Sequence, residues 1–171
     1  MKRYVWLFIA ACAVLSGCGG SDTSSTTPST TGECALTNDA ECIGSDLSGQ
    51  DLSGKGLIGI DFRNANLSNT KFIGADLTQA NLVGANLAGA DLSGATLVRM
   101  SLSSANASGA NFSGALLTGS DCRDANIEEA NFSRAYLTDA NFTGALNAPS
   151  FELALVCKTI LPDGKVAAPT C

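Results

Sequence analysis

The stretch ADLTQANLVGANLAGADLSG, residues 75–94, decides the fold. It consists of four blocks of five residues, each with alanine first, aspartate or asparagine second and leucine third. The same phase runs without a break from residue 45 to residue 144, which makes twenty blocks. The third residue, called the centre of its block, is Leu, Phe or Ile in eighteen of them, and only Ala107 and Cys122 differ.

A period of five matches neither the 3.6-residue period of a helix nor the two-residue period of a flat strand. It fits a coil with one side per block, in which the centre and the small first residue point inward. Stacked coils place like residues over like, and their backbones pair as in a sheet. This pattern predicts a solenoid, whose repeats bury a core only by stacking. Ala107 predicts a local packing gap, and Cys122 a small buried apolar side chain.

The motif A-[DN]-[LF]-x-x resembles the pentapeptide-repeat family, and the match covers 100 of the 171 residues. The resemblance implies that four blocks make one square coil and that the coil is right-handed. The expected fold is therefore all-β: a right-handed quadrilateral β-helix of about five coils, capped at both ends.

The first seventeen residues have the plan of a secretory signal peptide. Two basic residues, Lys2 and Arg3, precede an apolar run from Tyr4 to Leu15. This run of twelve residues is shorter than the roughly 20 that span a bilayer. We therefore expect residues 1–17 to be an export signal.

The sequence Leu15-Ser16-Gly17-Cys18 resembles the lipobox of bacterial lipoproteins. The resemblance implies cleavage before Cys18 and acylation of that cysteine with fatty acids such as palmitate, which would anchor the protein to a membrane of the cell envelope. Gly19 follows the cysteine, and in Gram-negative lipoproteins this implies the outer membrane. An ordinary signal peptide with an accidental cysteine is the alternative.

The segments around the repeats have separate expected roles. Residues 18–32 are rich in Ser, Thr and Gly and predict a flexible tether after the acylated cysteine. Residues 33–44 predict an N-terminal cap, in which residues 40–44 look like a degenerate block. Residues 145–171 predict a C-terminal cap. There the alternation of Phe151, Leu153 and Leu155 predicts a strand, and residues 161–164 predict a turn. Residues 156–164 resemble the tail of many exported pentapeptide-repeat proteins.

Four cysteines remain for the caps, and export permits disulfides. We expect two local pairs, Cys34 with Cys42 and Cys157 with Cys171, because the ends of a rigid rod cannot meet. Metal binding is the alternative, but the spacings do not resemble a zinc knuckle and no histidine is present. We therefore expect neither a metal nor a cofactor.

Composition narrows the classes of function. The absence of histidine removes the usual general base and every triad that depends on it. A net charge of −6 disfavours direct binding to nucleic acid. An enzyme would need a Ser–Lys or carboxylate pair, and no motif surrounds Lys55 or Lys71. We expect no catalytic residues.

The outward positions suggest one interaction surface. We name each side of the solenoid after its first centre: Leu47, Leu52, Leu57 and Phe62. The Leu57 side breaks the polar pattern and also carries an arginine, which predicts a protein-binding face. Neutral drift on an exposed surface is the alternative. The residues of this predicted face are Ile58, Val98, Arg99, Leu116 and Tyr136. A second feature, the acidic cluster of Asp121, Asp124, Glu128 and Glu129, reads as a solvated end of the rod.

The leading functional hypothesis is a non-enzymatic, lipid-anchored envelope protein that acts as a structural or protein-binding module. The alternative is nucleic-acid mimicry, because some cytoplasmic family members are similar to a DNA duplex in shape and charge and act on topoisomerases. The repeat body has ten acidic and six basic residues, a modest excess, and export would separate it from such a target. An enzyme without histidine is the third possibility.

Overall fold

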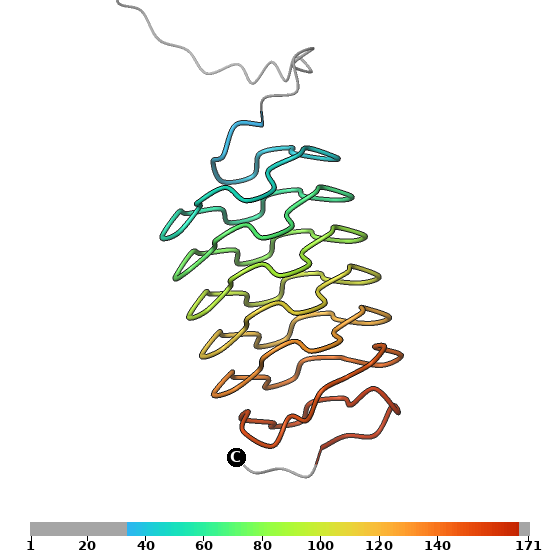
Figure 1. Cartoon of the computed structure of the whole chain (residues 1–171). Helices are drawn as coiled ribbons and strands as arrows, with labels where there is room; N and C mark the ends of the chain where they lie inside the picture. The colour runs from blue at the N-terminus through green and yellow to red at the C-terminus, as the bar shows by residue number, and fades with distance from the viewer. Residues whose placement is uncertain (1–33, 168–171) are drawn as a thin grey trace, which may run out of the picture. The chain divides into compact units, whose positions relative to one another are not determined.

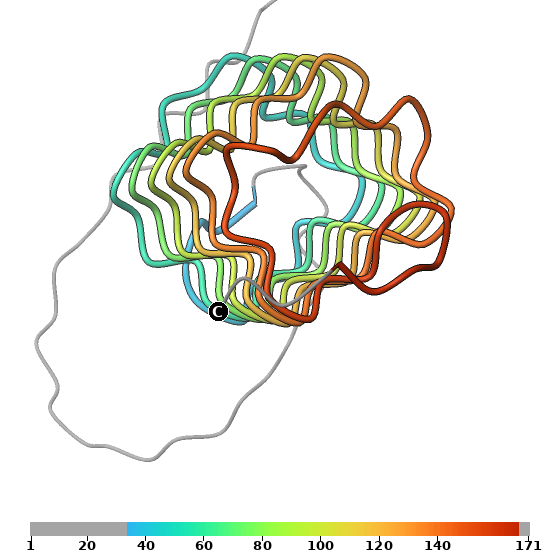
Figure 2. The same cartoon turned by 90° about the horizontal axis from the view of Figure 1, so that it is seen from below.

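The computed structural model describes residues 34–167, which all belong to one compact unit, Thr31–Cys171. The chain winds through a stack of coils (Figure 1), and successive coils nearly superimpose when viewed along the stack (Figure 2). Within residues 34–167 there are no helices and no strands longer than a single bridge residue. In this part of the chain no helix is long and apolar enough to cross a membrane.

Isolated parallel β-bridges hold the coils together. They join the second residue of each block to the second residue of the fourth block after it, from Glu41 with Asp61 to Asn126 with Leu146. One turn of the solenoid therefore takes four blocks, one on each side. The predicted all-β solenoid is confirmed, although its pairing consists of single bridges and not of extended strands.

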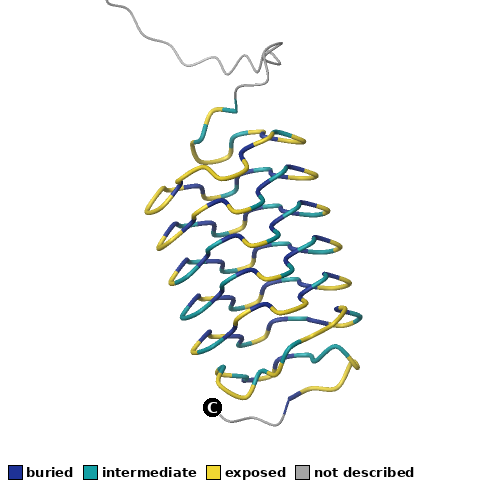
Figure 3. Cartoon of the chain, in the orientation of Figure 1, coloured by how far each residue is buried: buried dark blue, intermediate teal, exposed yellow. Residues whose placement is uncertain are grey.

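The core consists of the centres and the first residues of the blocks. All twenty centres are buried, including Ala107 and Cys122, which are both fully enclosed. The first residues are buried from Ile60 onward, so that buried and outward positions alternate along each coil (Figure 3). Near the C-terminal end the core contains packed aromatic rings: those of Phe112 and Phe132 stack with their centroids 4.9 Å apart. The packing gap expected at Ala107 remains a prediction.

The preference for Asp or Asn at the second position has a direct cause. Its side-chain oxygen accepts the backbone N–H two residues later, as Asn86 Oδ1 does from Ala88 at 3.2 Å, which stabilises the turn at each corner. On the Leu47 side the amides also bond from coil to coil, with N–O distances of 3.0 to 3.4 Å. This continuous asparagine ladder contains Asp46, Asn66, Asn86, Asn106, Asn126 and Asn147.

Replacing Asn86 with alanine should lower the free energy of unfolding by roughly 1–3 kcal/mol. The reason is that three modest hydrogen bonds are lost from a half-buried position. Chemical denaturation would measure the change. Thr96→Ala is the matched control, since Thr96 is also half-buried and holds the same repeat position but shows no side-chain hydrogen bond within residues 34–167. Equal losses in the two variants would contradict a stabilising role of the ladder.

The corners depend on a left-handed backbone. The fifth residue of every block has φ between 55° and 73°, and eleven of these twenty residues are glycine. The other nine have a Cβ: four are Asn or Asp, which tolerate this conformation, and for the remaining five it has a steric cost of about 1 kcal/mol or more each. Arg99 is one of them, with φ of 55°, so the Leu57 side carries its arginine on a strained corner.

At the N-terminal end, residues 40–44 behave as an additional block. Cys42 occupies the centre position with 2% of its surface exposed, and Gly44 has the left-handed φ of a fifth residue. A disulfide joins Cys42 to Cys34, the pairing that the sequence predicts. This bond ties the first described residue to the core.

At the C-terminal end the predicted strand is wrong. Leu153 is 74% exposed, and Leu155 forms a single bridge with Tyr136 instead of belonging to a strand. Residues 151–155 follow the path of one more coil. Alternate residues of a coil do not lie on one face, so the alternation of Phe151, Leu153 and Leu155 does not indicate a strand here. The turn at residues 161–164 is confirmed by the hydrogen bond from Gly164 N–H to the Leu161 carbonyl at 2.9 Å. Cys157 is disulfide-bonded, and its predicted partner, Cys171, lies outside the described residues.

Candidate interaction surface

Exposed apolar side chains stack on the Leu57 side near the C-terminal end. β-Bridges join Leu116 to Tyr136 and Tyr136 to Leu155, so these residues occupy the same position on three consecutive coils. Their exposed fractions are 37%, 47% and 41%. We call Leu116, Tyr136 and Leu155 the apolar ladder. On this side of the solenoid they form a continuous apolar strip in place of the polar residues typical of the second position.

The structure divides the face predicted from the sequence. Val98 is half-buried and lies beside the apolar ladder, because its neighbour Leu97 donates to the Leu116 carbonyl at 2.8 Å. Arg99 is exposed at the adjoining corner. Ile58 lies two coils before Val98 in the same column, and the polar residue Thr78 stands between them. Four of the five predicted residues therefore come together, whereas Ile58 stands apart.

Sequence reasoning missed Leu155, which it assigned to a strand of the cap. The sequence nevertheless carries a signal for it: residues 154–158, ALVCK, begin with alanine and have an apolar centre. Lys158 has φ of 53°, like the fifth residue of a regular block. Reading this segment as one more block would have placed Leu155 directly after Tyr136 on the Leu57 side.

The Phe62 side neutralises part of its own charge. Arg63 pairs with Asp61 at 2.7 Å, and Arg123 pairs with Asp121 at 2.6 Å. Hydrogen bonds from these guanidinium groups hold the pKa of each aspartate below its usual value and raise the pKa of each arginine. One member of the acidic cluster, Asp121, is therefore already paired, which fits a solvated surface better than a binding site for a cation.

Cys122 is buried and chemically protected. Burial raises the pKa of its thiol to about 12, and its sulfur lies 3.6 Å from Ser120 Oγ. A thiolate is the reactive form of cysteine, so the side chain acts as a small apolar residue of the core. Among residues 34–167, no cluster of three or more acidic or cysteine side chains could hold a metal ion.

Cys122 should resist alkylation in the native protein and react only after unfolding, because its thiol is both enclosed and protonated at neutral pH. Mass spectrometry after a timed exposure to iodoacetamide, without reductant, would measure the modified fraction. The same reaction in a denaturant is the control. Rapid modification of the native protein would contradict the burial of this side chain.

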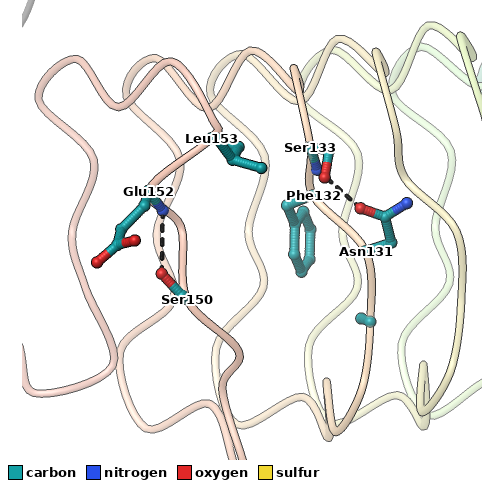
Figure 4. A pocket seen from close by; sticks show the side chains of 7 residues that line it. Asn131, Phe132, Ser133, Ser150, Glu152 and Leu153 are labelled. Carbon is teal, nitrogen blue, oxygen red and sulfur yellow. Dashed lines mark hydrogen bonds between the residues drawn. The ribbon is translucent and has the colours of Figure 1, made fainter.

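A shallow hollow of about 190 Å³ lies at the C-terminal end of the Leu52 side. Figure 4 shows Asn131, Phe132 and Ser133 of the last regular block on this side along one part of it, and Ser150, Glu152 and Leu153 of the following segment along the other. Backbone N–H groups of Ser133 and Glu152 bond to Asn131 Oδ1 and Ser150 Oγ, respectively. The hollow therefore lies where the tail departs from the stack.

Comparison with known proteins identifies the repeats. A family model described as pentapeptide repeats matches residues 40–79, 80–119 and 117–145. No curated protein sequence gives a significant match. A crystal structure of a pentapeptide repeat protein from the Arabidopsis thaliana thylakoid lumen is 38% identical over 56% of this chain, with a TM-score of 0.54. The chain spans 66% of that protein, slightly less than two thirds.

Two further solved structures have lower similarity. HetL, a protein involved in heterocyst differentiation regulation from the cyanobacterium Nostoc sp. strain PCC 7120, is 22% identical over 77% of this chain and 92% of its own, with a TM-score of 0.36. Full-length QnrB1, a plasmid-mediated fluoroquinolone resistance protein, is 20% identical over 72% of this chain and 73% of its own, with a TM-score of 0.44.

Proposed function

The chain belongs to the pentapeptide-repeat family, and from this premise we propose that it is a non-enzymatic, lipid-anchored protein of the cell envelope. Its proposed task is to bind another envelope protein through the apolar ladder. The observation that carries this proposal is the stacking of Leu116, Tyr136 and Leu155 on three consecutive coils, each more than one third exposed. These side chains contact water in the free protein, and burying their apolar surface against a partner would make the free energy of binding more favourable.

The location rests on residues 15–18, which resemble a lipobox, with Cys18 as the acylated residue and Gly19 directing the protein to the outer membrane in a Gram-negative cell. These residues lie outside the described part of the chain. The absence of histidine from the sequence and the exposure of the ladder on one side of the solenoid favour binding over catalysis.

The proposal also includes the finer architecture. Residues 45–144 would make five right-handed coils, because bridges between each block and the fourth block after it divide twenty blocks into five turns. Residues 33–44 and 145–171 would cap them. The disulfide of Cys42 and the packing of the Phe151 ring, 5.3 Å from Phe132 and 5.0 Å from Phe142, support these roles.

Replacing Tyr136 and Leu155 together with aspartate should reduce capture of the partner at least about tenfold, because each change places a charge in the centre of an apolar contact. Crosslinking in cells, followed by a pull-down in mild detergent, would measure the captured protein. This double variant leaves the buried centres unchanged, so its thermal unfolding, followed by circular dichroism, should match that of the unchanged chain.

Ile73→Asp is the matched control for this experiment. Ile73 is 44% exposed, similar to the residues of the ladder, but it lies on the Leu52 side. Capture by Ile73→Asp should equal that of the unchanged chain, and capture by Cys18→Ala should be lost with the anchor. If the ladder variant and the Ile73 variant captured the same partner equally, the proposed surface would be wrong.

A further inference from the structure

The β-ladder of the solenoid is complete at the C-terminal end on three sides. In each case a tail residue accepts a hydrogen bond from the N–H of a buried centre and donates one to the carbonyl of the residue two before that centre, with N–O distances of 2.8 to 3.1 Å. These tail residues are Leu146 on the Leu47 side, Leu155 on the Leu57 side and Ile160 on the Phe62 side. All three are large and apolar.

The Leu52 side lacks this last bridge. The corresponding groups are the N–H of Phe132 and the carbonyl of Ala130, and neither forms a backbone hydrogen bond within residues 34–167. The bridge between Asn111 and Asn131 is the last on this side in the described structure. Phe132 is only 3% exposed, and a buried N–H without a partner costs roughly 1–3 kcal/mol. One donor and one acceptor thus remain in the arrangement that a bridging residue requires.

A one-residue deletion in the tail explains the missing bridge. Tyr136 pairs with Leu155, whereas the regular repeat would pair it with the next residue along the chain. The Phe151 ring packs against Phe132 in the position of a centre, and the N–H of Glu152 bonds to Ser150 Oγ at 3.2 Å. Ser150 therefore holds the second position, but within the described residues its backbone forms no bridge to Asn131, and the hollow of about 190 Å³ lies between the two (Figure 4).

We propose that this gap binds an extended peptide segment of a partner protein, which adds the missing parallel β-bridge to the Leu52 side. A peptide backbone supplies both the carbonyl for Phe132 and the N–H for Ala130, as in recognition by strand addition. The bridging residue is Leu or Ile, because all three equivalent tail residues are. Its side chain lies beside Leu153, which is 74% exposed at the rim of the hollow. This site is separate from the apolar ladder on the Leu57 side.

Amide exchange measured by NMR on the full chain in detergent micelles tests the gap itself. The Phe132 amide should exchange at least about tenfold faster than those of Ile127, Leu137 and Phe142, whose hydrogen bonds to the tail must open first. Equal protection of the four amides would mean that the chain closes its own ladder, and this result would overturn the proposal.

The probe for binding is a blocked peptide that copies residues 152–156, ELALV, and so contains the bridging Leu155 with its flanking residues. Titration to about 1 mM should slow the exchange of the Phe132 amide at least about tenfold and leave the amides of Leu137 and Phe142 unchanged. The same peptide with an N-methyl group on its second leucine cannot donate to Ala130 and should have no effect. No protection by the first peptide, or equal protection by both, would overturn the proposal.

Two variants separate this site from the proposed function. Leu153→Asp should weaken the peptide at least about tenfold by placing a charge at the rim, while Leu155→Asp should leave its binding unchanged. In the pull-down Leu155→Asp should reduce capture of the partner and Leu153→Asp should not, because Leu155 belongs to the apolar ladder and Leu153 does not. If Leu153→Asp bound the peptide as well as the unchanged chain, the proposed position of the bridging side chain would be wrong.

Discussion

Phe112→Ala should lower the free energy of unfolding by about 3–5 kcal/mol, which is the cost of emptying a well-packed aromatic site. Phe112 is fully buried, and its ring stacks on Phe132 with an angle of 1° between the planes. In a solenoid each coil contacts only its neighbours, so a cavity in one coil weakens the interfaces on both of its sides. Urea denaturation followed by circular dichroism would measure the loss.

Tyr136→Ala is the control, since it removes an aromatic ring of similar size from a position that is 47% exposed. Its stability should change by roughly 0.5 kcal/mol or less. The two variants should also differ in function: Tyr136→Ala should remain folded but capture less partner. If Phe112→Ala were as stable as Tyr136→Ala, the stacked core would not be the source of stability.

Cys18→Ala should abolish fatty acylation of the protein, because the lipobox resemblance leaves this cysteine as the site to which the acyl chains attach. Several chains on one residue give durable anchoring, since each buried CH₂ contributes about 0.8 kcal/mol. Growth with an alkyne-labelled fatty acid, followed by capture of the labelled protein, would measure acylation. The label should fall to background.

Cys12→Ala provides the matched control. This cysteine lies in the apolar run of residues 4–15 and would be removed with the proposed signal peptide, so its replacement should leave labelling and membrane association unchanged. Retention of the label in Cys18→Ala would disprove lipidation at this residue. Loss of the label in both variants would instead indicate that the apolar run itself had been damaged, and a Cys12→Val variant would resolve this.

The candidate surface was predictable in part. Leu116 and Tyr136 break the polar pattern at a position that the repeat places outward, so the sequence alone indicated a patch on the Leu57 side. The sequence could not exclude Ile58, and it could include Leu155 only if residues 154–158 were read as one more block. Ile58 shares the side but stands two coils from Val98, and membership of a patch depends on distance along the stack. Leu155 joins the ladder one position earlier than the regular repeat would place a partner for Tyr136, and the phase of the repeats does not specify this deletion.

The corners show a similar division. Glycine at eleven of the twenty fifth positions, and Asn or Asp at four more, are compatible with a left-handed backbone. The other five, among them Arg99 and Glu129, give no local sign of positive φ. They adopt it because inter-coil hydrogen bonds and the buried centres on either side fix the path of the chain. Tertiary packing therefore overrides the local preference of these residues.

By itself the sequence determined the all-β solenoid and the identity of its buried centres, because a strict period of five brings the large third residue of every block to the same inward position. It also predicted the disulfide between Cys34 and Cys42, because the two ends of a rigid rod cannot meet. Only the tertiary structure decided how the tail meets the last coil. There the regular repeat ends, and the contacts between the tail and the last coil depend on how the Phe151 ring packs against Phe132 and Phe142. This packing ends the Leu52 ladder at Asn131 and aligns Leu155 with Tyr136, so it creates both proposed binding sites.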